Sequence, residues 1–207
     1  MKGKLITFEG LDGVGKTTVI NSLSEILKEE LGDKLITTFT PGSTNIGKKI
    51  KKIILESDKD ILPEEIKTSL FLYDHINHTQ EVLIPALESG KIILCDRYID
   101  SFIAYQRFGY NINLDFLSLI NFPSPAKTFL LEVPIEELSR RLLKRSLNKE
   151  NNWMDSMDIE FYSRIELGYK WLANENPNRI ETINANVSFD SLLNILLNIL
   201  LKEIKIL

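Results

Sequence analysis

The stretch from Gly10 to Thr17 constrains this chain more than any other part of its sequence. It reads Gly-Leu-Asp-Gly-Val-Gly-Lys-Thr, which is the pattern G-x-x-x-x-G-K-[ST] of a phosphate-binding loop, or P-loop. An apolar run, residues 5–8, precedes the loop, and apolar residues at helical spacing follow it as far as position 31. The motif therefore lies between a strand and a helix, and it predicts a binding site for a nucleoside triphosphate.

The residues of this loop have separate tasks in such a site. Gly13 and Gly15 let the backbone wrap around phosphate oxygens and turn its N–H groups inward. The helix that begins at Lys16 adds the positive end of its dipole. The Lys16 ammonium reaches the β- and γ-phosphates, and the Thr17 hydroxyl ligates Mg²⁺. We assign nucleotide binding to the loop and the residue after it: Gly10, Leu11, Asp12, Gly13, Val14, Gly15, Lys16, Thr17 and Thr18.

Composition limits the partners of the chain. Its 207 residues suit a single domain over residues 1–207, and its net charge of −4 includes no basic block, so nucleic acid is a poor candidate partner. The most apolar stretch, residues 192–201, contains Asn194 and Asn198 and is too short to span a bilayer. No signal-peptide pattern precedes the first strand. We expect a cytoplasmic protein that does not act on a membrane, with its single cysteine, Cys95, as a buried thiol.

Strand-like and helix-like segments alternate along the chain. Strands are predicted at residues 5–8, 35–39, 91–95, 128–133 and 179–183. Helices are predicted at residues 16–31, 46–55, 63–73 with a possible extension to 87, 101–106, 114–120, 135–145, 159–172 and 189–204. The lysine face of the second helix, residues 48–52, is expected to be solvated surface. This alternation predicts an α/β protein of three layers, the P-loop NTPase fold, with a five-stranded parallel sheet, helices on both faces and a lid at about residues 141–156.

Asp96 and Arg97 follow directly after the predicted strand at residues 91–95. Ligands of parallel α/β sheets bind beyond the carboxyl ends of the strands, so we expect both side chains beside the P-loop. Asp96 suits the acidic residue that holds the Mg²⁺ shell. Arg97 can make bidentate contacts to a phosphate, which a kinase with a phosphorylated acceptor needs. The Asn-Lys-x-Asp motif by which GTPases of this fold read guanine does not occur in the sequence.

Two further arginines, Arg141 and Arg145, are four residues apart on one face of a predicted helix, just before a polar loop at residues 146–155. A closing lid that carries an arginine stabilises the charge that spreads over a phosphoryl group during transfer. We interpret both residues as catalytic lid arginines, and the alternative is a pair of solvated surface side chains.

Several segments resemble the thymidylate (dTMP) kinase family of P-loop nucleoside monophosphate kinases. Residues 8–18 look like the opening of these enzymes, and residues 96–106 look like their signature D-R-Y-x-x-S-x-x-A-Y-Q. Phe71, Asp74 and His78 match a segment similar to F-A-A-D-R-x-x-H, and residues 41–44 correspond to P-G-G-T. The resemblance implies a homodimeric, Mg²⁺-dependent enzyme that transfers the γ-phosphoryl group of ATP to dTMP for the synthesis of DNA precursors.

The same resemblance assigns roles to single residues. It places Asp12 near the acceptor sugar and phosphate, stacks Phe71 on the thymine ring, and packs Tyr105 under the deoxyribose. It assigns the acceptor phosphate to Arg97 and the acceptor pocket to Ser101 and Gln106. Some family members carry an arginine within the P-loop, but position 13 here is glycine. We therefore expect the catalytic arginine to come from the lid, as Arg145 with Arg141 in support.

The chain also departs from the family pattern around the acceptor. His75 stands where the family has an arginine that helps to bind the acceptor phosphate, and we expect it to assist Arg97 as a partly charged ring. Otherwise we expect His75 and His78 to be surface or capping residues rather than metal ligands. Further departures are Phe39-Thr40 for Arg-Glu, Phe102 for a small or amide residue, and residues 152–155 for D-R-x-E in the lid. Two alternatives stay open: a kinase of another nucleoside or deoxynucleoside monophosphate, and a P-loop module that binds nucleotide without catalysis.

Overall fold

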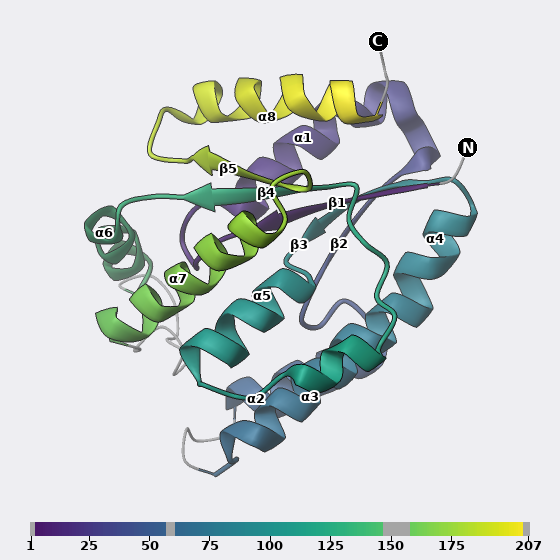
Figure 1. Cartoon of the computed structure of the whole chain (residues 1–207). Helices are drawn as coiled ribbons and strands as arrows, with labels where there is room; N and C mark the ends of the chain where they lie inside the picture. The colour runs from purple at the N-terminus through teal and green to yellow at the C-terminus, as the bar shows by residue number, and fades with distance from the viewer. Residues whose placement is uncertain (1–2, 57–60, 147–157, 205–207) are drawn as a thin grey trace.

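A parallel sheet of five strands forms the middle layer of the protein (Figure 1). The computed structural model describes residues 3–56, 61–146 and 158–204. The strands are β1 (Lys4–Glu9), β2 (Leu35–Phe39), β3 (Ile92–Asp96), β4 (Lys127–Glu132) and β5 (Ile180–Asn184), in the spatial order β2-β3-β1-β4-β5. The predicted α/β fold with five parallel strands is therefore confirmed.

The central strand β1 pairs with β3 on one side and with β4 on the other. Its side chains from Leu5 to Glu9 are buried, because helices cover both faces of the sheet and leave no solvated side. The order of the strands reverses at β1, since β2 and β3 lie on one side of it and β4 and β5 on the other. In open parallel sheets, ligands bind at the carboxyl ends of the strands at such a reversal.

Helices cover both faces of the sheet (Figure 1). One face carries α1 (Lys16–Leu31) and α8 (Phe189–Ile204). The other face carries α3 (Glu64–His78), α4 (Ile84–Glu88), α5 (Ile99–Ile103) and α7 (Ile159–Glu175). The helix α2 (Asn45–Glu56) packs against α3, and α6 (Ile135–Ser146) lies beyond the carboxyl ends of the strands. Short 3₁₀ turns occur at Gly32–Lys34 and Asp115–Leu119.

Two of the predicted helices contain a π-helical segment. The long helix that begins after Pro63 continues through Thr79–Leu83, which is π-helical, into α4. Pro85 cannot donate a backbone hydrogen bond, and the wider turn lies directly before it. A second π-helical segment, Ala104–Gly109, follows α5 and carries Tyr105 and Gln106. The first segment falls within the predicted helix and its extension to residue 87, and the second begins within the predicted helix at residues 101–106 and continues to Gly109.

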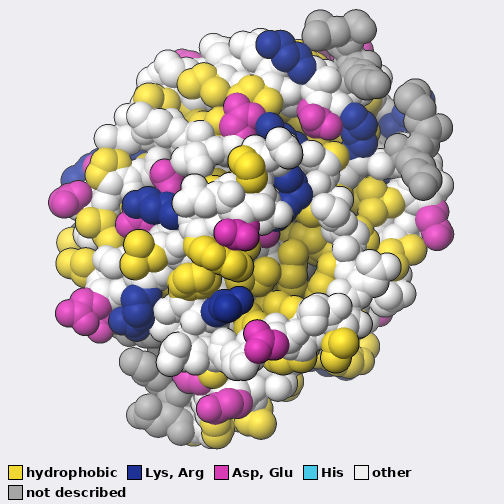
Figure 2. All heavy atoms as spheres, in the orientation of Figure 1, with side chains coloured by type: hydrophobic (Ala, Val, Ile, Leu, Met, Phe, Trp, Pro, Cys, Tyr) yellow, Lys and Arg dark blue, Asp and Glu magenta, His cyan; other side chains and the backbone are white. Residues whose placement is uncertain are grey.

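The surface in Figure 2 carries charged side chains of both signs. Lys and Arg side chains alternate there with Asp and Glu side chains, and no broad patch of one sign appears among the residues described in this view. In the described ranges, every helix is too short or too polar to cross a bilayer.

The helix α7 packs unusually closely on the π-helical segment after α5. A Cβ atom added at Gly168 would lie 2.8 Å from Cγ of Phe108, and one added at Gly109 would lie 3.0 Å from the Phe161 ring. Real Cβ contacts are essentially never shorter than 3.0 Å, so Gly168 requires glycine for this approach, and a side chain at Gly109 would force the Phe161 ring to shift. The contact fixes α7 against the segment that carries Tyr105.

We expect Gly168→Leu to destabilise the protein by about 2 kcal/mol, because forcing a side chain into a filled contact outweighs the gain of roughly 0.8 kcal/mol in helix propensity. Asn174→Leu, at an exposed position of the same helix, should change stability little. Urea unfolding followed by circular dichroism measures both variants. Equal stability of the two variants would contradict the close contact.

Candidate active site

A cleft of about 950 Å³ opens at the carboxyl ends of the central strands. Thirteen residues that the sequence assigns to a site line this cleft: Asp12, Gly13, Gly15, Lys16, Thr17, Thr18, Phe71, His75, Asp96, Arg97, Ser101, Tyr105 and Gln106. They come from the P-loop and the start of α1, from α3, and from the end of β3 with the segment after it. The structure therefore brings the predicted nucleotide loop and the predicted acceptor residues into one cleft.

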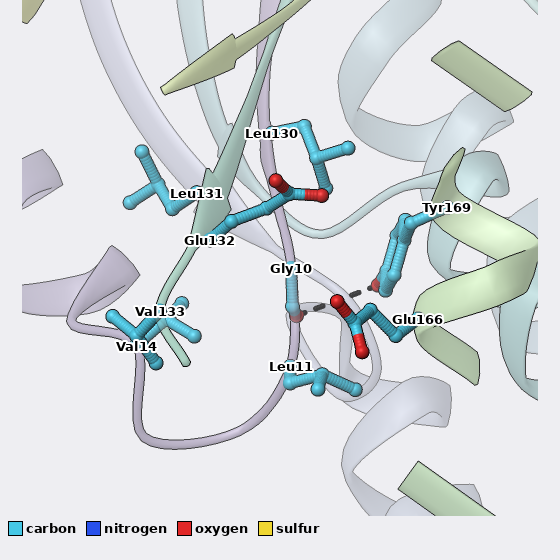
Figure 3. Close-up of a pocket in the computed structure, with 9 residues that line it drawn as sticks. All are labelled: Gly10, Leu11, Val14, Leu130, Leu131, Glu132, Val133, Glu166 and Tyr169. Carbon is cyan, nitrogen blue, oxygen red and sulfur yellow. Dashed lines mark hydrogen bonds between the residues drawn. The ribbon is translucent and has the colours of Figure 1, made fainter. Parts of the chain in front are cut away.

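The P-loop turns sharply between β1 and α1. Its three glycines, Gly10, Gly13 and Gly15, have φ angles of 128°, 86° and 104°, which favour glycine. A Cβ atom at Gly10 would lie 2.3 Å from the carbonyl oxygen of Leu131, so the loop lies directly against β4. Gly10, Leu11 and Val14 line a separate small cavity behind the loop, which Figure 3 shows.

Lys16 is buried at the first turn of α1. Its ammonium donates hydrogen bonds to the carbonyl oxygens of Gly10 (3.0 Å) and Leu11 (2.8 Å). Burial lowers the pKa of Lys16 to about 8, with the Arg97 charge adding to the shift and nearby carboxylates opposing it. An anion at the loop favours the charged form, so this lysine suits phosphate oxygens.

Thr17 and Asp96 meet beside the loop. The Thr17 hydroxyl donates a hydrogen bond of 2.5 Å to Oδ2 of Asp96. A hydroxyl and a carboxylate are hard oxygen ligands, and Mg²⁺ commonly uses one or two protein groups together with water and phosphate oxygens. The pair therefore fits Mg²⁺. Within the described ranges, no three His, Cys, Asp or Glu side chains gather into a fuller metal cluster.

The backbone of Arg97 is held in an uncommon conformation. Its φ angle of 66° lies in the left-handed region, which costs a residue other than glycine roughly 1–3 kcal/mol and is found mostly at functional sites. Its N–H donates to the carbonyl of Phe8, and its own carbonyl accepts from the Thr40 hydroxyl and the Cys95 thiol. Cys95 is buried as predicted, and burial raises the pKa of its thiol.

The Arg97 guanidinium forms a salt bridge with Asp12 across the cleft wall. Its Nη2 lies 2.8 Å from Oδ1 of Asp12, and the Tyr105 hydroxyl donates to Oδ2 of the same carboxylate at 3.0 Å. Burial alone would raise the pKa of Asp12, but the charges of Arg97 and Lys16 and the hydrogen bond from Tyr105 hold it well below its ordinary value. Asp12 therefore remains ionised. Its partner Arg97 is largely buried, with 14% of its side chain exposed.

Aromatic rings and one side-chain amide line the acceptor side of the cleft. Phe71 of α3 is half-buried, and Tyr105 lies under the Arg97 guanidinium, whose Cζ is 5.3 Å from the ring centre. The Thr68 hydroxyl donates a hydrogen bond of 2.6 Å to Oε1 of Gln106. This bond fixes the Gln106 amide, which lines the cleft. The wall therefore offers flat apolar surface and one oriented amide.

Both histidines lie inside the protein, so the expectation of surface or capping residues is wrong. His75 is 4% exposed and His78 is 0% exposed, because this face of α3 packs inward. The ring of His75 meets Phe102 edge-on at 5.5 Å, and Nε2 of His78 lies 2.7 Å from the Thr38 hydroxyl. Burial lowers the pKa of His75 to about 3 and that of His78 to about 4. The expectation of a partly charged His75 is therefore also wrong, and the cleft receives a neutral ring.

The lysine face of α2 is only partly solvated. Lys48, Lys49 and Lys52 are exposed, but Lys51 is half-buried, lines the cleft and places its ammonium 5.7 Å from the centre of the Phe39 ring. The expectation for Lys51 is therefore corrected. Helical spacing predicted that the lysines share one face of α2. It could not predict that Lys51 lies against Phe39 at the end of β2.

The structure also adds two residues that sequence reasoning missed, Glu9 and Tyr169. Glu9 is a charged residue at the end of an apolar strand, and this contrast is a signal that could have found it. Tyr169 comes from α7, far along the chain, and nothing in the sequence links it to the P-loop. Its hydroxyl lies 3.3 Å from Nη1 of Arg97.

The predicted lid is described only at its beginning. Arg141 of α6 donates from Nε to Glu137 at 2.7 Å and from Nη1 to the backbone carbonyl of Val14 at 3.4 Å, so it lies against the P-loop. Arg145 is in the last turn of α6, but its side chain falls outside the described part of the chain, as do residues 147–157.

Comparisons with known proteins agree with one another. A family model described as thymidylate kinase matches residues 8–194. A thymidylate kinase of Enterococcus faecalis is 37% identical over 195 residues, which cover 92% of each chain. One of Staphylococcus epidermidis is 38% identical over 191 residues, covering 89% of this chain and 91% of the relative. A crystal structure of thymidylate kinase from Ehrlichia chaffeensis has a TM-score of 0.77 and 27% identity, with 97% of this chain and 99% of that chain covered.

We expect both histidine rings to stay neutral in the folded protein as the pH falls from about 8 to about 5, since burial holds their pKa values near 3 and 4. The chain has only these two histidines, so an NMR titration of their ring protons reads them separately. The same titration in denaturant is the control and should show a midpoint near about 6.5. Such a midpoint in the folded protein would contradict the burial.

Proposed function

This chain belongs to the thymidylate kinase family, and we propose that it transfers the γ-phosphoryl group of ATP to dTMP, giving dTDP. The observation that carries the proposal is the shared cleft, in which a P-loop meets a buried arginine that is paired with Asp12. A protein that only binds a nucleotide needs the P-loop but has no use for a second phosphate clamp. A kinase with a phosphorylated acceptor needs both.

The donor half of the cleft is the P-loop. The backbone N–H groups of residues 10–18 and the Lys16 ammonium bind the triphosphate of ATP. Thr17 and Asp96 are the residues that would hold Mg²⁺, which supplies neutralisation of the charge on the β- and γ-phosphate oxygens when it is bound. Lys16 already rests on carbonyl oxygens of the loop, so it needs only a short movement to reach a phosphate.

The acceptor half binds dTMP by one cation and several neutral groups. Arg97 binds the acceptor phosphate, and Asp12, which is ionised and hydrogen-bonded to Tyr105, lies near the acceptor sugar and phosphate and assists transfer. Phe71 stacks on the base. His75 lines the base end of the cleft as a neutral ring, and Ser101 and Gln106 complete the pocket.

Arginines from α6 stabilise the charge that develops during transfer. Arg141 already contacts the P-loop carbonyl of Val14, and Arg145 follows one helical turn later. Gly13 brings no arginine of its own, so we assign the transition-state charge to these two residues and to a lid at about residues 141–156.

We also propose that the enzyme is a cytoplasmic homodimer in which residues 1–207 form one domain. The support for a dimer is a set of exposed apolar residues on the packed helices α2 and α3. Its members are spaced seven residues apart on each helix and are exposed: Ile46, Ile53, Ile66 and Tyr73.

A coupled ADP-release assay with ATP and Mg²⁺ tests the acceptor. We expect dTMP to be strongly preferred over dUMP, dCMP, dGMP and AMP, because the cleft joins a phosphate clamp to a flat, mostly neutral base pocket. A preference for another acceptor would indicate a different nucleoside monophosphate kinase. Tight ATP binding without turnover of any acceptor would indicate a binding module.

We expect Arg97→Ala to raise the KM for dTMP and lower kcat, with a loss of about a hundredfold in kcat/KM, because a buried charged contact to the acceptor phosphate is removed. Binding of ATP should persist. Arg107→Ala, which removes an exposed arginine that lies over the Trp171 ring and does not line the cleft, is the matched control and should leave the kinetics unchanged. Unchanged dTMP kinetics in Arg97→Ala would contradict the assigned role.

A further inference from the structure

A buried carboxyl group lies directly behind the P-loop and takes no part in the roles assigned so far. Glu9, at the end of β1, is 1% exposed. Its Oε1 accepts a hydrogen bond of 2.8 Å from the backbone N–H of Tyr98, and its Oε2 accepts one from the Ser101 hydroxyl. Glu9 therefore holds both the backbone that follows Arg97 and the first hydroxyl of the acceptor pocket.

Tyr169 of α7 contacts the same Ser101 hydroxyl as Glu9 does. This residue of α7 is 3% exposed, and Figure 3 shows its ring extending from the helix toward Gly10. Its hydroxyl lies 2.8 Å from Oγ of Ser101 and 3.4 Å from the carbonyl oxygen of Gly10. The hydroxyls of Tyr169 and Ser101 thus form a pair between the P-loop and the segment after β3.

Both hydroxyls accept hydrogen bonds from Arg97. Nη1 of the guanidinium lies 3.0 Å from Oγ of Ser101, 3.3 Å from the Tyr169 oxygen and 3.0 Å from the Gly10 carbonyl. Nη2 is bound on the other side by Asp12 and Tyr105. Nε of Arg97 makes no hydrogen bond with the described residues, so its N–H is the donor that is left for a ligand.

We propose that Tyr169 and Glu9 are positioning residues that orient the Arg97 guanidinium for the acceptor phosphate through the Ser101 hydroxyl. The inference rests on the proposed function, in which Arg97 binds that phosphate. Glu9 anchors Ser101, Ser101 and Tyr169 fix Nη1, and the Nε–H stays available to a ligand in the cleft that Arg97 lines. Tyr169 belongs to the helix that follows the predicted lid, so this contact also joins α7 to the acceptor half.

Orientation matters here for a physical reason. An arginine side chain loses rotamer entropy when it is fixed, and its planar fork binds a phosphate well only within roughly 10–20° of the productive geometry. Acceptors on one nitrogen restrain the plane before the ligand arrives. The guanidinium then loses its conformational entropy when the protein folds rather than when the ligand binds. The free energy of phosphate binding is more favourable as a result.

Tyr169→Phe tests the proposal, because it removes one hydroxyl and keeps the ring. We expect the Kd for dTMP, measured by calorimetry, to rise about tenfold, as for a lost hydrogen bond to a charged group. The Kd for thymidine, which has no phosphate, should stay unchanged, as should the Kd for ATP. The matched control is Tyr110→Phe, because the Tyr110 ring also packs on α7 but its hydroxyl has no partner among the described residues.

Three results would overturn the proposal: an unchanged Kd for dTMP, an equal loss for dTMP and thymidine, or the same loss in Tyr110→Phe. An equal loss for both ligands would mean that the hydroxyl serves the general structure of the pocket. A wild-type protein that does not bind dTMP would instead overturn the proposed function, and this inference with it.

Glu9→Gln provides a second variant if Tyr169→Phe does not fold, which a thermal unfolding curve reveals. Burial raises the pKa of Glu9 to about 8, so the variant is measured at about pH 9, where the wild-type group is ionised; its amide oxygen can still accept from the Tyr98 N–H, but its NH₂ group replaces the oxygen that accepts from Ser101. We expect the same selective loss for dTMP over thymidine. If the ratio of the Kd for dTMP to the Kd for thymidine is the same in Glu9→Gln as in the wild type, the role of Glu9 is overturned.

Discussion

The salt bridge between Asp12 and Arg97 joins two segments that are 85 residues apart in the sequence. Asp12 belongs to the loop after β1, and Arg97 follows the end of β3, which is the neighbouring strand. Lys16 and Arg97 are two cations in a confined space, and each makes the charge of the other less favourable. The Asp12 carboxylate compensates both. The Arg97 side chain is 14% exposed and the Asp12 side chain 34%, so solvent screens the pair only in part and its attraction couples the loop to Arg97.

Local sequence patterns predicted the parts of the site that are made from continuous segments. The P-loop motif carries its own strand, turn and helix start, and the parallel arrangement of β1 and β3 follows from the alternation of elements. These patterns could not predict which face of α3 turns inward. Helical spacing is the same for a surface histidine and for His78, and only the packing of α3 against Thr38 decides its burial. The contact of Tyr169 with Arg97 could not be predicted for a similar reason, since it depends on how α7 packs against a segment far away in the sequence.

The cations that line the cleft are few. Among its described lining residues they are Lys16, Lys51 and Arg97. Because His75 is neutral, it adds no charge to the acceptor half, where a dianionic phosphate is proposed to bind. The orientation of a single guanidinium then matters more than it would in a pocket with two arginines. This scarcity of charge explains why five protein acceptors surround Arg97: they keep one cation in place where a second is missing.

The position of β1 at the centre of the sheet has a consequence for synthesis of the chain. Ile6 pairs with Lys127, so the P-loop strand keeps one open edge until more than half of the chain has been made. At a translation rate of roughly 5–20 residues per second, this edge waits on the order of ten seconds for β4. Residues 4–9 are apolar enough to associate with other nascent strands during that time. The strand that leads into the nucleotide-binding loop is thus also a strand whose edge stays exposed while the rest of the sheet is synthesised.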